Sequence, residues 1–204
     1  MTVTRRAAQT APRKTARSLP ARWLTTSPEL KLLAAAPGDR ELQACSHVLV
    51  LFAAELLANG KLPAALPGAA LLQDTLGRRR KKPTAALIPE ATMPGGGLVR
   101  WMALNQGDSV FLRQQALREA FAPLLTEQPA RVDVVLHGDA AFVNAILGDA
   151  AYVGCVNRVS LPKTVRVDAA DKKTRHIKVT EPESGVLRFW VGPSIKAAVR
   201  SVYA

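Results

Sequence analysis

The stretch His47-Val48-Leu49-Val50-Leu51-Phe52 is a continuous apolar run that contains β-branched residues. A run without polar alternation is typical of a strand that is buried on both faces of a sheet. Leu98–Leu104 is expected to form a second strand, and Arg131–Leu136, which alternates and then runs apolar, a third. Apolar residues with helical spacing occupy three segments between and after these runs: Gly68–Leu76, the stretch after Asp108 or Ser109, and Asp139–Asn157. Strands that alternate with helices predict an α/β fold, in which helices cover a mixed or mostly parallel sheet.

The two longer helices are expected to be amphipathic. The expected inward residues of the first are Val110, Phe111, Leu117, Phe121, Leu124 and Leu125, and those of the second are Phe142, Val143, Ile146, Tyr152 and Val153. Asp108 or Ser109 can cap the first helix. Pro123 lies inside its pattern, so we expect a kink or a late break there.

The remaining segments carry weaker patterns. Pro28–Leu33 is expected to form a short helical turn, and Leu87–Gly97 a loop, because prolines and glycines punctuate it. Two strand-like pieces follow at Arg175–Thr180 and Gly185–Val191. A short amphipathic helix is expected from Pro193 to about Tyr203.

Composition places the chain among globular proteins. It has 204 residues, of which 48% are hydrophobic and 22% charged, enough for one ordinary domain with a core. No stretch approaches the roughly 18 consecutive apolar residues of a membrane-spanning helix, so no membrane span is expected. The two cysteines, Cys45 and Cys155, are isolated and fit a reducing compartment.

The net charge of +12 is unevenly distributed along the chain. Residues 1–27 contain six basic residues and no acidic ones, which leaves 22 basic against 16 acidic residues, or +6, for residues 28–204. An acid-free segment rich in Arg and Ser is typical of an organellar transit peptide. Its end, Arg22-Trp23-Leu24-Thr25-Thr26-Ser27, fits the Arg-x-Leu-x-x-Ser pattern near mitochondrial processing sites. A disordered basic tail and a retained RNA-binding arm are the alternatives.

A family resemblance becomes visible between Trp101 and Val167. Its residues are Trp101-Met102, Phe111-Leu112-Arg113-Gln114-Gln115, Leu117-Arg118-Glu119-Ala120, Pro123-Leu124-Leu125, Glu127-Gln128-Pro129, Ala151-Tyr152-Val153, Val156-Asn157 and Leu161-Pro162-Lys163. The pattern resembles the N-terminal domain of a bacterial-type leucine aminopeptidase branch, over about residues 45–167. The resemblance implies a macro-like fold, with helices on both sides of a mixed sheet. We therefore expect a single macro-like domain over residues 28–204, preceded by a basic extension over residues 1–27.

The catalytic motifs of that family do not occur in the printed sequence. Its two-zinc chemistry needs carboxylates that converge on both metal ions. The family motifs Lys-x-x-x-x-Asp-Thr-Gly-Gly and Asn-Thr-Asp-Ala-Glu-Gly-Arg are both missing. Arg158 stands where the family usually has a glycine, which predicts a remodelled turn. We therefore expect a non-enzymatic chain without a cofactor.

Other motifs give little support for catalysis. His47, His137 and His176 have no partner at metal-binding spacing, so structural roles are expected. The turn at His137-Gly138-Asp139 could form an anion site, although a helix cap is the better interpretation. Gly95-Gly96-Gly97 precedes a strand rather than a helix, which favours a hairpin-like connection over a phosphate loop.

Two basic clusters are the candidate binding features. The first is the run Arg78, Arg79, Arg80, Lys81 and Lys82, and the second comprises Lys163, Arg166, Lys172, Lys173 and Arg175. Consecutive cations repel one another unless an anion lies nearby. A solvated loop is the simpler interpretation of each run. Two clusters together favour an anionic partner, such as RNA or an acidic subunit.

These features favour a non-catalytic subunit, built on an aminopeptidase-like domain, in a large mitochondrial assembly that contains RNA, such as a ribosome. Its partners would be other protein subunits and RNA, and its location the mitochondrial matrix, with the cytoplasm as the alternative. A second hypothesis is the regulatory or oligomerisation domain of a zinc aminopeptidase whose catalytic domain is missing or on another chain. A third, a macro-type nucleotide binder, rests on fold analogy alone.

Overall fold

The computed structural model describes residues 28–57, 61–78, 88–158, 164–167, 176–179 and 185–192. A six-stranded mixed sheet organises this part of the chain, with strand order β1-β8-β5-β2-β4-β3. The strands are β1 (Glu29–Leu33), β2 (His47–Ala53), β3 (Glu90–Thr92), β4 (Leu98–Leu104), β5 (Arg131–His137) and β8 (Val186–Trp190). All neighbouring pairs are parallel except β3 with β4. The α/β fold class is therefore confirmed.

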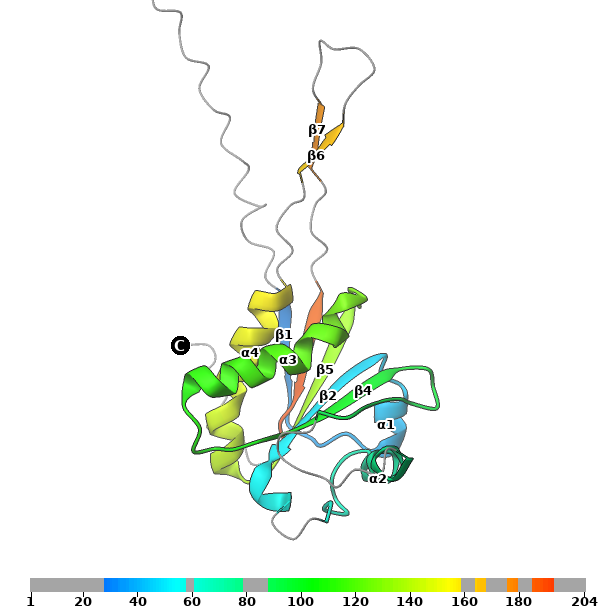
Figure 1. The fold of residues 1–204 in the computed structure, drawn as a ribbon, viewed down its shortest axis with the longest axis vertical. Helices are drawn as coiled ribbons and strands as arrows, with labels where there is room; N and C mark the ends of the chain where they lie inside the picture. The colour runs from blue at the N-terminus through cyan, green and yellow to red at the C-terminus, as the bar shows by residue number, and fades with distance from the viewer. Residues whose placement is uncertain are drawn as a thin grey trace, which may run out of the picture.

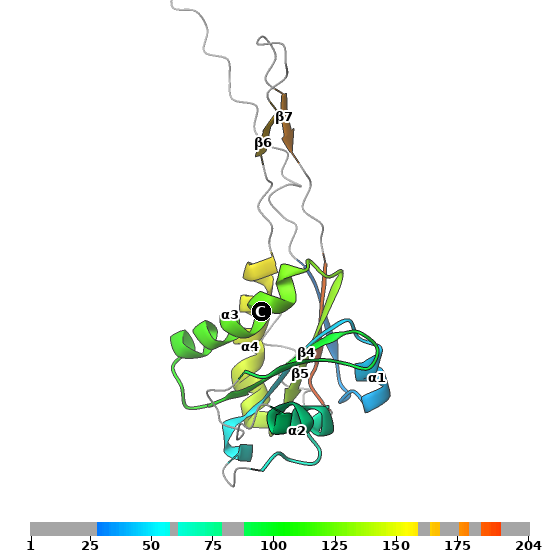
Figure 2. The ribbon, with the colours of Figure 1, turned by 45° about the vertical axis from the view of Figure 1, so that its right-hand side comes forward.

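Helices lie on both faces of this sheet. Figures 1 and 2 show α3 (Val110–Thr126) and α4 (Ala140–Arg158) on one face, and α1 (Asp39–Gln43) and α2 (Ala69–Arg78) on the other. A short 3-10 helix, η2 (Ala54–Leu57), follows β2. All seven residues of β2 are buried, as its continuous apolar sequence predicted.

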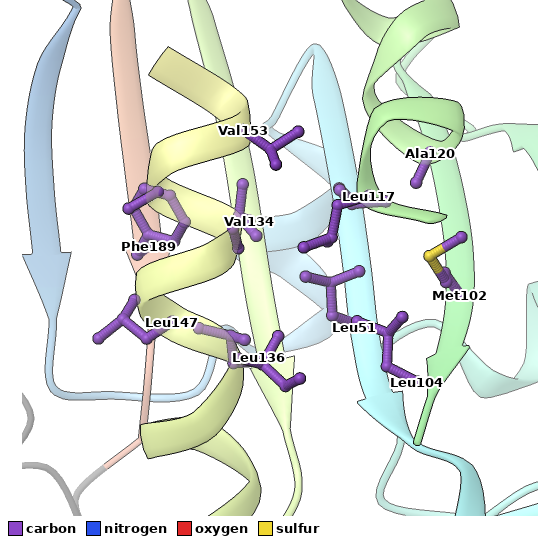
Figure 3. Close-up of a cluster of buried hydrophobic side chains, with 14 of the residues drawn as sticks. Leu51, Met102, Leu104, Leu117, Ala120, Val134, Leu136, Leu147, Val153 and Phe189 are labelled. Carbon is purple, nitrogen blue, oxygen red and sulfur yellow. The ribbon is translucent and has the colours of Figure 1, made fainter. Parts of the chain in front are cut away.

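The larger core cluster lies between the sheet and the α3–α4 layer. Figure 3 shows strand residues such as Leu51, Val134 and Phe189 facing Leu117 of α3 and Leu147 of α4. These side chains are almost completely buried. Such burial contributes roughly 1.5–3 kcal/mol per large aliphatic side chain. In this core α3 packs against β2 and β4, and α4 packs against β5 and β8.

Two segments expected without strands contain them. Residues 29–33, expected as a helical turn, form the edge strand β1, which pairs in parallel with β8. Leu87–Gly97 was expected to be a loop, yet it contains β3, which pairs antiparallel with β4. The amide of Met93 donates to Gly97 O at 2.6 Å, which closes a hairpin turn. The three glycines therefore belong to a hairpin, as their position before a strand indicated.

The expected inward faces of the long helices are only partly correct. Val110 and Phe111 begin α3 and are exposed, because the helix starts beyond the edge of the core. Tyr152 of α4 is also exposed, whereas Phe142, Val143, Ile146 and Val153 are buried. Ser109 caps α3, accepting a 3.4 Å hydrogen bond from the amide of Leu112.

A separate two-stranded sheet joins β6 (Thr164–Val167) to β7 (His176–Val179) in antiparallel register. The sequence indicated a strand near β7 but not its partner. The expected C-terminal helix from Pro193 and the extension over residues 1–27 lie outside the described residues.

The apolar character of α4 has a structural explanation. Within the part of the chain that the structure describes, α4 is the one helix long and apolar enough to cross a membrane. The sequence of α4 is not a continuous apolar stretch, because Asn144, Asp149 and Asn157 interrupt it. For that reason no membrane-spanning helix was expected from the length of its apolar runs. The inner face of α4 packs against β5 and β8 in the core, and a buried core helix meets the same criteria.

Candidate interaction surfaces

The first basic cluster begins at the end of a helix. Arg78 is the last residue of α2, and its guanidinium lies 2.7 Å from Asp74, one helical turn earlier. The pair is largely exposed, so it contributes only a few tenths of a kcal/mol. The positive charge of Arg78 is therefore partly neutralised by Asp74 of the same helix. Arg79, Arg80, Lys81 and Lys82 lie outside the described residues.

The second basic cluster is associated with the β6–β7 hairpin. Arg166 lies in β6 opposite Ile177 of β7. Lys172, Lys173 and Arg175 fall in the sequence between these two strands, and they lie outside the described residues together with Lys163. Of the second basic cluster, the described ranges thus include only the backbone of Arg166. They show no contact between the two basic clusters.

A third charged cluster, which the sequence analysis missed, centres on Asp133 of β5. This carboxylate is fully buried and accepts three hydrogen bonds. Its Oδ1 accepts from Nε of Arg188 and, at 2.9 Å, from Nε1 of Trp190. Its Oδ2 accepts from Nε of Arg131 at 3.0 Å. Asp133 is a single acidic residue within a mainly apolar strand, and this feature of the sequence could have predicted the cluster. A buried carboxylate requires cationic or hydrogen-bonding partners.

Arg188 connects this cluster to Cys45. The Arg188 guanidinium lies 4.8 Å from the centroid of the Trp190 ring, and its Nη2 contacts Cys45 Sγ at 3.6 Å. Burial lowers the pKa of Arg188, but the hydrogen bond and charge of Asp133 outweigh it, and the net pKa is raised. Burial and Asp133 both raise the pKa of the Cys45 thiol. The thiol is therefore held protonated, opposite to the activation of a nucleophilic cysteine.

Arg158, the last residue of α4, ties the helix to two strands. Its guanidinium donates to Pro129 O, just before β5, and to Val186 O, at the start of β8. Burial lowers the pKa of Arg158, although these carbonyl oxygens satisfy its donors. Arginine at this position thus has a structural use that a glycine could not supply.

The histidines occupy different environments. His47 Nε2 lies 2.9 Å from Glu127 Oε2, which links the start of β2 to the end of α3. Its Nδ1 is buried without a hydrogen-bond partner. His137 is half-buried at the end of β5, and burial lowers its pKa. The following Asp139 caps α4, because its Oδ1 accepts from the amide of Phe142 at 2.7 Å. The side chain of His176 lies outside the described part.

Exposed apolar side chains lie at the start of α3 and on α4. Phe111, with 73% exposure, is the most exposed large apolar residue among those described. Val110 and Leu112 flank it, and Tyr152 and Val156 are exposed on α4. The 2.8 Å ion pair between Arg113 and Asp149 joins the two helices close to these residues. Within the described ranges, no three His, Cys, Asp or Glu side chains gather closely enough to hold a metal ion.

Comparison with known proteins identifies a similar fold. No protein-family model and no curated protein sequence matches the chain. Among solved structures, the fold is similar to a mutant of tomato leucine aminopeptidase, with a TM-score of 0.53 and 14% sequence identity. The match covers 87% of this chain and 36% of the aminopeptidase chain. The fold is thus of a class found in part of a leucine aminopeptidase, and this chain spans about a third of that protein's length.

Proposed function

We propose that this chain is a non-catalytic structural or interaction subunit of a large mitochondrial assembly that contains RNA, such as the ribosome. The observation that carries the proposal is a combination of fold and sequence. The chain shares an aminopeptidase-like fold, but its printed sequence has neither zinc-binding motif of that family. The domain is related, in this proposal, to the N-terminal domain of the enzyme.

The distribution of charge supports an anionic partner. Residues 28–204 carry a net charge of +6 beyond the basic extension, and the two basic clusters provide ten of their cations. A protein that neutralises phosphates with such residues gains affinity by releasing condensed counterions. The transit-like composition of residues 1–27 supports import into mitochondria.

The test is the sedimentation of the tagged full-length protein in mitochondrial lysate, with and without ribonuclease. The proposal expects migration with a large particle that ribonuclease disperses. A variant with Arg79→Gln and Arg80→Gln should be released from the particle at lower salt than wild type. The matched control replaces exposed Arg40 and Arg118 by glutamine, since neither belongs to a basic cluster. Small, ribonuclease-insensitive wild-type particles would contradict the proposal.

The fold similarity also favours a second function, the regulatory or oligomerisation domain of a zinc leucine aminopeptidase with its catalytic domain elsewhere. This alternative expects a hexamer-sized species that hydrolyses a leucyl substrate when zinc or manganese is added with a catalytic chain. Turnover by the isolated chain with these metals would refute the non-catalytic proposal.

A further inference from the structure

Three cations occupy neighbouring positions on one face of the sheet. Lys31 of β1 is in register with Arg188 of β8, which is in register with Asp133 of β5. Arg131 lies two residues before Asp133 in the same strand. Because side chains alternate between faces with a period of two, all four project from the face that carries α1 and α2. We call Lys31, Arg131 and Arg188 the cationic triad.

The three cations of the triad exceed the two carboxylates on the same face, Asp133 and Glu29, by one charge. One cation neutralises a buried carboxylate, but Asp133 holds both Arg131 and Arg188. Lys31 lies 3.4 Å from Glu29, and both side chains are more than half exposed. Such a pair contributes little, because water screens it and two long side chains must be ordered. Lys31 can therefore turn to another anion at small cost.

The two guanidinium groups are held in fixed positions. Both donate to Asp133 through Nε, and Arg188 also stacks on the Trp190 ring. Among the described residues, the Nη atoms of Arg131 make no hydrogen bond that would occupy them. An arginine fixed in this way loses less conformational freedom on binding, and its planar fork matches the oxygens of a phosphate group.

Solvent reaches the triad from this face. The side chains of Arg188, Arg131 and Lys31 are 22%, 40% and 51% exposed. Parallel sheets are normally covered on both faces, and α2 packs instead against β3 at the opposite edge of the sheet. We propose that the cationic triad is a binding site for a phosphate group, with Asp133 as its positioning residue. The proposed function supplies the expected source, which is the RNA backbone.

The first experiment measures binding of a fluorescently labelled single-stranded RNA to the full-length protein over a range of salt concentrations. Arg131→Gln and Lys31→Gln are the test variants, because both side chains are exposed enough to be replaced without unfolding. Each lost phosphate contact should flatten the slope of log affinity against log salt by about 0.7. The control is Arg118→Gln on α3, an exposed arginine on the other face of the sheet, which should keep the wild-type slope. Equal slopes for wild type and both test variants would exclude an RNA contact at the triad.

The second experiment separates the site from its expected ligand. Inorganic phosphate should raise the melting temperature of wild-type protein more than that of Arg131→Gln, with sodium chloride at equal ionic strength as reference. Arg188→Lys keeps the charge but loses the fork, and it should lower the phosphate effect as well. A selective phosphate effect without RNA binding would assign the site to free phosphate and remove the RNA contact from the proposed function. The absence of both effects would overturn the site itself.

Discussion

Arg100 of β4 supplies a hydrogen bond that Pro123 of α3 cannot make. In a regular helix the amide of residue 123 would donate to the carbonyl of Glu119, but proline has no amide hydrogen. Arg100 Nη1 instead donates to Glu119 O and to Ala120 O, each at 2.8 Å. The helix consequently continues through Pro123 to Thr126. Of the kink or late break expected from the proline, a break at Pro123 itself does not occur, and α3 ends three residues later at Thr126.

The first prediction tests this relationship. Arg100→Met should lower the free energy of unfolding by about 1–3 kcal/mol, because it leaves the partly buried Glu119 carbonyl without a donor. Pro123→Ala restores the backbone donor, so in that background the same substitution should cost about 1 kcal/mol less. Urea denaturation of the single and double variants measures this coupling. Strictly additive losses would show that Arg100 acts independently of Pro123.

This pair illustrates what the sequence could and could not predict. Mainly apolar segments located β2, β4 and β5, because burial on both faces leaves a strong local pattern. The effect of Pro123 was predicted from its own helix alone. The hydrogen bond that replaces its missing amide comes from Arg100, about twenty residues away in β4. Edge strands β1 and β3 were missed for a related reason. Their half-exposed sequences are defined by their partners β8 and β4 rather than by a periodic pattern.

The second prediction concerns Asp133. Asp133→Asn should lower the free energy of unfolding by about 3–5 kcal/mol, because it leaves Arg131 and Arg188 without their shared counterion. The matched control is Asp74→Asn, which removes the exposed partner of Arg78 and should cost less than about 0.5 kcal/mol. Urea denaturation of both variants provides the comparison. Similar losses for the two would mean that Asp133 behaves as a surface carboxylate.

The cationic triad around Asp133 could not be predicted from the sequence, unlike the two basic clusters. Runs of like charge are visible in a sequence, so the two basic clusters were found directly. The cationic triad comes from three strands, and its residues are separated by up to 157 positions between Lys31 and Arg188. Only the parallel register of β1, β8 and β5 brings them together. The insertion of β8 between β1 and β5 could not be derived from local spacing.

The third prediction compares two phenylalanines of α3 that the apolar pattern placed on one inward face. Phe111→Ser should change the free energy of unfolding by no more than about 0.5 kcal/mol, because Phe111 is largely exposed. Phe121→Ala should cost about 3–5 kcal/mol, because Phe121 is fully buried in the core. Thermal unfolding followed by circular dichroism distinguishes the two. A large loss for Phe111→Ser would restore the inward position expected from the sequence.

The fourth prediction concerns the close approach at Gly97. A Cβ atom there would lie 2.7 Å from Met93 Cε and 2.9 Å from Ser46 O, and nearer still to Cys45 O. Gly97→Ala should therefore cost about 1–3 kcal/mol, since backbone atoms cannot move aside as a side chain can. Gly107→Ala is the control, because nothing lies within 4 Å of its Cβ position. That control should be neutral or more stable than wild type by up to about 1 kcal/mol. Equal stability of the two variants in urea denaturation would contradict the tight hairpin packing.

The fifth prediction follows from His137. Burial lowers its pKa below the usual value of about 6.5. The folded protein therefore binds fewer protons at this site than the unfolded chain in mildly acidic solution. Stability is thus fully present above about pH 6.5 and is lost as the pH falls toward the depressed pKa of the folded state. His137→Gln cannot take up this proton, so its stability should fall less than that of wild type between pH 7.5 and pH 5. Urea denaturation at each pH measures the difference, and values at pH 7.5 correct for any change in packing. Parallel pH profiles for the two proteins would show that His137 titrates alike in the folded and unfolded states.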